Sequence, residues 1–346
     1  MKDYLIIGCG LAGISFAETA LKHNKTFTVF TDTSQNSSIV AAGIYNPVIV
    51  KRLSMPSGAA AHMDYIKPFY AEIEQRLKVT FDHKIPLYRK FASVEEQNDW
   101  FAATDKPGLS AFLSTKIILK HYDYLPSPFG FGEVLHTGYA DTALLVDNYK
   151  AFLKKNNLLI HESFDYNSLE IHDSYILYKG IMAKNIVFAE GFGIHANPFF
   201  SNLPLAGTKG ELLLVRAPLL KLDAIVNAGV FILPVGNDLY KVGATYEWTD
   251  KTSVPTAAAK AELLQKLNGL ITCDYEVMAH YAGIRPTTKD RKALIGTHPK
   301  HKRVHLLNGL GTRGVMLGPP MAKQLFDFIE HGIEPDPSVN LSRFMV

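Results

Sequence analysis

The hydrophobic pattern is most regular near the N-terminus. Residues Tyr4–Ile7 are continuously apolar, which predicts a buried β-strand. A glycine-rich segment follows, and Ile14–His23 has the length and composition of a helix. After a turn at Asn24-Lys25, the β-branched and aromatic residues Thr26–Phe30 predict a second strand. The succession of strand, glycine turn, helix and strand is typical of a dinucleotide-binding fold.

The rest of the chain carries both helical and strand patterns. Helices are predicted at Asp64–Leu77, Ser93–Ala102, Thr142–Asn156, Thr256–Leu270 and Pro320–His331. Strands are predicted at Leu158–His161, Ile171–Lys179, Asn185–Ala189, Glu211–Arg216, Val230–Leu233, Tyr240–Thr245 and Val304–Leu307. The strands between residues 211 and 245 favour a second, largely antiparallel sheet. Because no Ser/Gly linker separates the two groups of strands, we expect two interleaved domains.

Composition narrows the class of protein. A length of 346 residues suggests two domains, and 47% hydrophobic with 20% charged residues excludes a disordered or fibrous chain. The formal charge of +3 gives no footprint for dedicated nucleic-acid binding. Cys9 and Cys273 form neither a disulfide framework nor a zinc site, so we predict no metal. No apolar run approaches the ~20 residues of a membrane span, and we expect a cytoplasmic protein.

The glycine turn is the first candidate binding site. In Gly8-Cys9-Gly10-Leu11-Ala12-Gly13, the glycines allow backbone amides to approach a pyrophosphate at the N-terminus of the following helix. An acidic residue at the end of the second strand usually accepts hydrogen bonds from the ribose. Here Thr31 occupies the usual position and Asp32 follows it, so the sequence leaves open which of the two contacts the ribose.

A series of segments in the same order resembles the D-amino-acid oxidase-like FAD-dependent oxidoreductases, a family that includes glycine oxidase and sarcosine oxidase. They are Gly8–Gly13, Ser38–Pro47, Asn185–Gly191, Lys209–Glu211 (which resembles a turn), Val242–Glu247, Ala282–Asp290 and Asn308–Val315. The resemblance implies an α/β protein in which a Rossmann-type FAD-binding domain is interleaved with an antiparallel-sheet α+β substrate domain. We predict that residues 1–80, 141–204 and 286–346 form the FAD-binding domain, and that residues 81–140 and 205–285 form the substrate domain.

The resemblance also implies the FAD contacts. They are Gly8, Gly10, Leu11, Ala12, Gly13, Thr31, Asp32, Ala41, Ala42, Gly43, Ala189, Gly191, Gly309, Gly311, Thr312, Arg313, Gly314 and Val315. Arg313 is either a cation beside the reduced flavin or a surface arginine. The closing turn lacks the cysteine, and Ser38–Gly43 lacks the histidine, that tether flavin covalently in some relatives. We therefore expect non-covalent FAD.

Arg285 is the strongest candidate for substrate binding. It lies in the otherwise uncharged stretch Ala282–Thr288, and a guanidinium group suits bidentate recognition of a carboxylate. The resemblance places Arg285 as the arginine that holds the substrate carboxylate in glycine oxidase-like enzymes. Tyr246 and Tyr45 match pocket positions, with core packing as the alternative for each. No residue is singled out as a catalytic acid or base.

The hypothesis is that an amine or amino acid is oxidised at its C–N bond to an imine by hydride transfer to flavin N5, with dioxygen or another acceptor reoxidising the flavin. Ala42–Pro47 and Gly309–Gly314 also resemble the FAD domain of a tRNA wobble-uridine modification enzyme. Oxidation of the carboxymethylaminomethyl group of that tRNA is therefore an alternative, which is possible but not favoured, and the mild basicity of the chain neither supports nor excludes it. A 2-hydroxy-acid dehydrogenase and a non-catalytic flavin-binding protein are the others.

Overall fold

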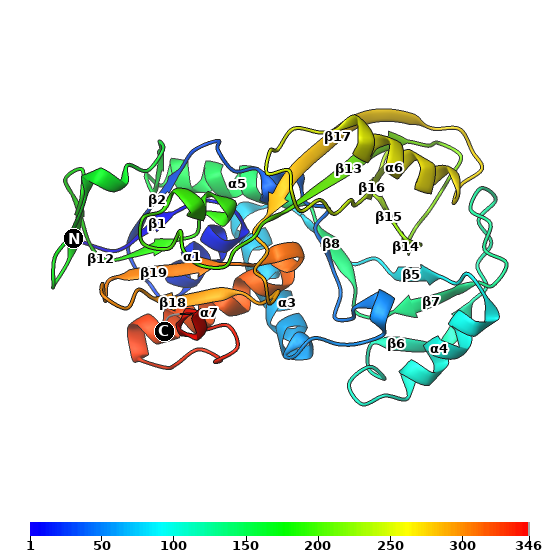
Figure 1. Cartoon of the computed structure of the whole chain (residues 1–346), viewed down its shortest axis with the longest axis horizontal. Helices are drawn as coiled ribbons and strands as arrows, with labels where there is room; N and C mark the ends of the chain where they lie inside the picture. The colour runs from blue at the N-terminus through cyan, green and yellow to red at the C-terminus, as the bar shows by residue number, and fades with distance from the viewer. Residues whose placement is uncertain (345–346) are drawn as a thin grey trace.

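The computed structural model describes residues 1–344, and its first sheet has a parallel core. Five strands lie in the order β19-β12-β1-β2-β9 and every neighbouring pair is parallel. Their bounds are β1 Lys2–Ile7, β2 Phe27–Thr31, β9 Leu159–His161, β12 Ile181–Phe188 and β19 Val304–Asn308. Strands far apart in sequence therefore end side by side, as the left half of Figure 1 shows. The carboxyl ends of such strands are where open α/β sheets bind ligands.

Three antiparallel strands extend this sheet. β10 (Leu169–Ile171) and β11 (Ile176–Tyr178) form a hairpin against the first half of β12, and β18 (Leu294–Thr297) pairs with β19. The prediction of one continuous strand over Ile171–Lys179 was wrong. Residues 172–175 connect β10 to β11, and the polar His172-Asp173-Ser174 sequence within them suits a tight connection.

Both faces of the parallel core are covered. Helices α1 (Leu11–Lys22), α3 (Ala59–Leu77), α5 (Thr142–Lys155) and α7 (Gly314–His331) share one hydrophobic core with Tyr4 and Ile6 of β1. The alternate residues Leu5 and Ile7 belong to a second core on the opposite face. Because a strand presents successive side chains to opposite faces, a strand covered on both faces has no polar positions. This explains the uninterrupted apolar run at the N-terminus.

Helix α7 begins six residues before the predicted start at Pro320. Pro319 and Pro320 lie inside it. A proline nitrogen cannot donate to the carbonyl group four residues earlier, so Pro319 leaves the Val315 oxygen without its helical partner. The buried hydroxyl of Tyr70 on α3 donates to that oxygen at 2.6 Å. A tertiary hydrogen bond thus replaces the missing helical one, which the sequence of the helix alone does not reveal.

The second sheet lies beside the first and is antiparallel except for one pair. Its order is β17-β13-β16-β15-β14-β5-β7-β6, and only β14 and β5 are parallel. The bounds are β5 Leu87–Lys90, β6 Leu113–Ile118, β7 Phe131–Val134, β13 Thr208–Arg216, β14 Ile225–Asn227, β15 Phe231–Pro234, β16 Leu239–Gly243 and β17 Glu276–Arg285. Helix α6 (Ala257–Asn268) packs on one face, and α4 (Val94–Thr104) lies near β6.

Two features of this sheet differ from the sequence prediction. Lys209–Glu211 is not a turn, because β13 begins at Thr208 and pairs with β17 throughout this segment. Strand β17, which ends at Arg285, was not predicted. Helix α4 is capped by side chains at its N-terminus: the Ser93 hydroxyl accepts from the Glu96 amide at 3.3 Å, while the Glu96 carboxylate accepts from the Ala92 amide at 2.8 Å.

A small third sheet lies between the two. It consists of β3 (Ile44–Tyr45), β8 (Gly138–Ala140) and β4 (Asp82–His83), and the short helix α2 (Ser37–Val40) precedes it. The chain passes between the large sheets several times, which confirms the predicted fold class. The predicted domain boundaries remain a prediction. Within residues 1–344, no helix is both long enough and apolar enough to cross a membrane.

Candidate functional site

A cavity of about 700 Å³ extends from the carboxyl ends of the parallel strands to the second sheet. This volume lies within the range of ligand-binding pockets in proteins, roughly 300–1,000 Å³. Its first part is lined by the glycine turn after β1, the ends of β2, β9 and β12, and the segment around α2. Its second part is lined by β13, β16 and β17. We call these parts the nucleotide end and the substrate end.

The glycine turn closes only because it has no side chains. Gly8 has φ +106°, and a Cβ atom on it would overlap the carbonyl oxygen of Ala189, the residue directly after β12. A Cβ on Gly13 would overlap the carbonyl oxygen of Gly8. Gly13, in the first turn of α1, does not line the cavity, and its missing side chain lets α1 pack closely against Gly8, which does line it. Gly10, Leu11 and Ala12 do line it.

The N-terminus of α1 is suited to an anion. Its N-cap residue, Gly10, supplies no side-chain hydrogen bond to the first turn. The Leu11 amide donates to the Ser38 hydroxyl at 3.0 Å, which brings a second donor group to the same place. Backbone N–H groups at a helix N-terminus, together with the helix dipole, favour a phosphate there.

Both candidates for the ribose contact line the cavity. Asp32 accepts hydrogen bonds from the hydroxyl groups of Ser34 and Ser163, each at 2.7 Å. Burial raises the pKa of Asp32, but these bonds more than offset it and hold the pKa below its ordinary value. Thr31 precedes it and also lines the cavity. We keep both as predicted ribose contacts.

A second carboxyl group at the nucleotide end, that of Glu190, has a raised pKa, whereas that of Asp32 is lowered. Burial raises the pKa of Glu190 to about 7, although hydrogen bonds from Tyr166 and Asn197 act against the shift. Nearby, the Asn308 side chain donates to the Gly191 carbonyl at 2.8 Å and accepts from the Gly309 amide. This asparagine joins the turn after β12 to the turn after β19. The two glycine-containing segments that the sequence predicts as flavin contacts are therefore adjacent.

Arg285 and Tyr246 meet at the substrate end. The guanidinium carbon of Arg285 lies 4.6 Å from the centre of the Tyr246 ring, and both residues line the cavity. Arg285 Nη1 donates to the carbonyl oxygen of Thr245 at 3.2 Å, and more weakly to that of Lys209 at 3.5 Å. Burial lowers the pKa of Arg285 from its ordinary value, and Tyr246 opposes the shift. Within residues 1–344, no carboxylate forms an ion pair with Arg285.

The remaining predicted residues fall into two groups, those that line the cavity and those that do not. Thr31, Ala41, Ala42, Gly43, Ala189, Gly191, Gly311, Thr312, Gly314 and Val315 all line the cavity. Gly309 and Arg313 do not. Burial lowers the pKa of Arg313, and Tyr246 opposes the shift, as it does at Arg285. Tyr45 does not line it either. Its buried hydroxyl donates to Asp82 at 2.6 Å and accepts from Lys84, so we leave it out of the proposed substrate site.

Sequence reasoning missed several lining residues. Lys150 of α5 and Glu162 after β9 lie at the nucleotide end, and Asn227, Phe231 and Leu212 lie at the substrate end. Glu162 follows a predicted strand, and its place at the carboxyl end of a parallel strand was a usable signal. The other four carry no motif, because the pairing of distant strands brings them to the cavity.

These residues fit a flavin dinucleotide. In a bound flavin dinucleotide, the glycine turn and α1 would hold the pyrophosphate and Thr31 or Asp32 the ribose, while the turns at Gly191 and Gly311 would offer backbone groups farther along the same cavity. Among residues 1–344, no group of three or more His, Cys, Asp or Glu side chains is placed to hold a metal ion.

Comparisons with known proteins agree with this geometry. Glycine oxidase from Pseudomonas putida is 26% identical over 370 residues, covering 97% of each chain. Glycine oxidase from Bacillus subtilis is 26% identical over 222 residues, which are 58% of this chain and 59% of the relative. A bifunctional tRNA 5-methylaminomethyl-2-thiouridine biosynthesis protein from Shewanella halifaxensis is 28% identical, but over only 41% of this chain and 28% of its own length.

Solved structures and family membership complete the comparison. The crystal structure of glycine oxidase from Geobacillus kaustophilus superposes with a TM-score of 0.80 and 19% identity, covering 97% of this chain and 96% of that one. The sequence matches the family described as FAD dependent oxidoreductase over residues 3–328. The glycine turn, the cavity and this match agree, and the chain belongs to the DAO family of FAD-dependent oxidoreductases.

Proposed function

We propose that this protein oxidises the C–N bond of a small amine or amino acid to an imine, with non-covalently bound FAD as the electron acceptor. The observation that carries the proposal is that the Arg285 guanidinium group has no carboxylate partner within residues 1–344. Its guanidinium group faces the cavity at the substrate end and is held by backbone carbonyl oxygens rather than by a carboxylate. A partly buried cation with free donors is a site for an anion, and a carboxylate matches its fork-shaped geometry.

The lining of the substrate end supports a reaction without a strong protein base. Within the described residues, the second sheet contributes no carboxylate and no histidine to the cavity. The acidic lining residues Asp32, Glu162 and Glu190 belong to the nucleotide end. A substrate amine that enters in its neutral form needs no base, because its nitrogen lone pair forms the C=N bond as the hydride leaves the carbon.

The residues of the substrate end then act by positioning. Arg285 binds the carboxylate, and the Tyr246 ring above the guanidinium group limits the directions from which a substrate enters. FAD, when bound, accepts the hydride and is reoxidised by dioxygen or another acceptor. The imine is hydrolysed by water to a carbonyl compound and an amine or ammonia. A fixed orientation of substrate and cofactor supplies much of the rate enhancement in such reactions.

Non-covalent binding has its own support. Cys9 is the one cysteine on the described lining, and no histidine lines it. Cys9 is almost fully buried, and burial raises the pKa of its thiol to about 12. A neutral buried thiol is a poor nucleophile toward a flavin ring. Heat denaturation is therefore expected to release all the flavin into the supernatant, where its absorption spectrum is measured.

The function is tested by anaerobic reduction of the flavin. Glycine, sarcosine, proline and D-amino acids are added in turn, and loss of the visible flavin bands identifies a donor. Arg285→Ala is then expected to raise the KM of that donor at least about a hundredfold while FAD stays bound, because the carboxylate loses its charged partner. Arg285→Lys keeps the positive charge but loses the forked geometry of the guanidinium group. Its KM should therefore lie between those of the wild type and Arg285→Ala. Bleaching only by 2-hydroxy acids, or by no donor, would contradict the proposal.

A further inference from the structure

The three residues Lys209, Gly210 and Glu211 lie at the start of β13, next to the end of β17. Successive side chains on a strand point to opposite faces. Gly210 lines the cavity, and a Cβ atom on it would overlap the Arg285 guanidinium group. Lys209 and Glu211 therefore point away from the cavity. Both side chains are buried, with 0% and 2% of the residue exposed.

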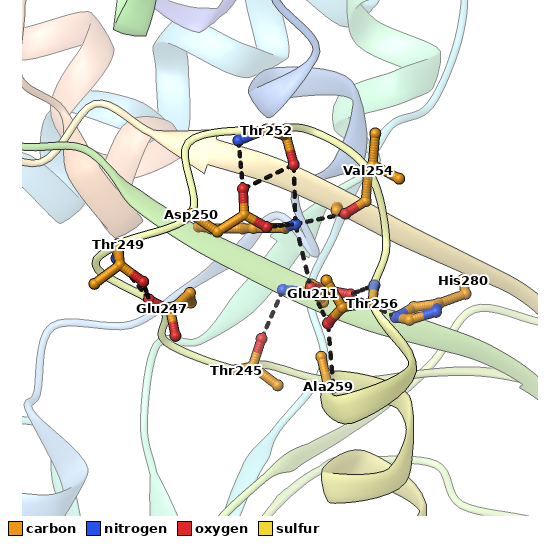
Figure 2. A network of polar contacts seen from close by, with 12 residues as sticks. Glu211, Thr245, Glu247, Thr249, Asp250, Thr252, Val254, Thr256, Ala259 and His280 are labelled. Carbon is orange, nitrogen blue, oxygen red and sulfur yellow. Dashed lines mark hydrogen bonds and ion pairs between the residues drawn. The ribbon is translucent and has the colours of Figure 1, made fainter.

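Lys209 is buried against the loop that follows β16. Its ammonium group donates to Asp250 Oδ2 at 2.5 Å and to the Val254 carbonyl oxygen, and it lies 3.4 Å from the Thr252 hydroxyl. Figure 2 shows these three loop residues grouped around one point. A fully buried ammonium group is stable only when such partners surround it, and breaking a buried pair typically costs several kcal/mol. The contact therefore fixes the middle of the loop, which we define as residues 245–256 and call the clamp loop.

Glu211 fixes both ends of the clamp loop. Its backbone amide donates to the Thr245 hydroxyl at 3.0 Å, and its carboxylate accepts from the Thr256 amide at 2.8 Å and hydroxyl at 2.9 Å. Thr256 is also the N-cap of α6. Nε2 of His280 lies 2.9 Å from the same carboxylate (Figure 2).

The clamp loop carries the aromatic wall of the substrate end. The backbone of Lys209 pairs with Glu247 in both directions, at 2.8 and 3.0 Å, which places Tyr246 over Arg285. Tyr246 is 62% exposed, so packing against its own neighbours does not hold it. The Lys209 carbonyl oxygen also accepts from Arg285. One short segment thus orients both the arginine and the tyrosine.

We propose that Lys209 and Glu211 are positioning residues for substrate binding: they hold the clamp loop so that Tyr246 and Arg285 form one carboxylate clamp, while Gly210 leaves room for the guanidinium group. The inference rests on the proposed function, because it concerns the same carboxylate site. It assigns a role to three residues that touch neither substrate nor cofactor through their side chains. It also explains why a lysine, a residue without side chain and a glutamate follow one another here.

The experiment uses Lys209→Met and Asp250→Ala in the FAD-loaded protein. The first variant removes the buried cation, and the second removes its partner from the loop side, where the Asp250 side chain is 30% exposed and its loss leaves no buried cavity. Lys260→Met is the matched control, because the Lys260 side chain is exposed on α6 and makes no hydrogen bond or ion pair within residues 1–344. Two quantities are measured: the rate of tryptic cleavage after Lys251 in the clamp loop, and the dissociation constants of acetate and benzoate from changes in the flavin spectrum.

We expect both test variants to keep FAD, to be cleaved after Lys251 about tenfold faster, and to bind the carboxylates about tenfold more weakly, which is 1.4 kcal/mol. The KM of an amino-acid donor should rise more than kcat falls. Faster cleavage with unchanged carboxylate binding would overturn the inference, since the loop would then be fixed for stability alone. Unchanged cleavage would overturn it as well. If neither carboxylate perturbs the wild-type flavin spectrum and Arg285→Ala changes no KM, the proposed function itself fails.

Discussion

The two ends of the cavity are built by different means. At the nucleotide end, six consecutive residues place backbone against backbone, and the missing side chains of Gly8 and Gly13 make the contact possible. At the substrate end, Arg285 comes from β17 and Tyr246 from the clamp loop. Backbone oxygens hold the guanidinium group, and the Lys209 side chain of β13 holds the loop. A site made by close backbone approach tolerates no added atom. At the substrate end a side chain can move to make room for an added atom. We therefore expect substitutions there to weaken substrate binding in part rather than to abolish it.

The largest effect is expected from Gly13→Ala. A Cβ atom there would overlap the Gly8 carbonyl oxygen, and a backbone oxygen cannot move without opening the turn. We expect FAD binding to weaken by at least about a hundredfold, as measured by fluorescence titration of the flavin-free protein. Gly269→Ala is the control, because its φ is −77° and the nearest atom would lie 3.5 Å from the new Cβ. Purification of Gly13→Ala with a full complement of FAD would show that the turn is not rigid.

A smaller effect is expected from the same substitution at the substrate end. A Cβ on Gly210 would overlap the Arg285 guanidinium group, but that group ends a flexible side chain and can move aside. Gly210→Ala should therefore keep FAD and raise the KM for an amino-acid donor by about ten- to a hundredfold. Steady-state kinetics and the flavin content of the purified variant measure both quantities. Loss of FAD from this variant would remove the distinction between the two ends.

The same contrast explains what the sequence could predict. The strand, glycine turn and helix at the N-terminus depend on contacts within about thirty residues, and local pattern was sufficient to predict them. Helix α7 was predicted to begin too late, because a hydroxyl on α3 satisfies the carbonyl group that Pro319 leaves free. The fold class followed from several motifs taken together. No single strand pattern indicated which strands of the second sheet are neighbours.

The candidate site shows the limit more sharply. Arg285 and Tyr246 were predicted because each lies in a segment that resembles a known family, and the structure brings them together. Tyr45 lies in such a segment too, but its hydroxyl is taken by Asp82. Lys209 lies in the segment Lys209–Glu211, which also resembles the family. Its side-chain contacts, however, are with a loop more than forty residues away, from Asp250 to Val254. A buried ion pair between distant segments has no signature in either segment alone.

The smallest effect concerns Glu190, a buried carboxyl group at the nucleotide end. Burial raises its pKa to about 7, above the ordinary value of 4.5. Between these two pH values the folded protein therefore keeps a proton on Glu190 that the unfolded chain releases. The stability that this group contributes is complete below about pH 4.5 and is lost as the pH rises through 7. Glu190→Gln stays neutral at every pH, so between pH 5 and 8 its melting temperature should fall by a few degrees less than that of the wild type. The comparison uses flavin-free protein, and parallel curves for the two proteins would show that Glu190 is ionised throughout and that the nucleotide end owes nothing to a side-chain proton.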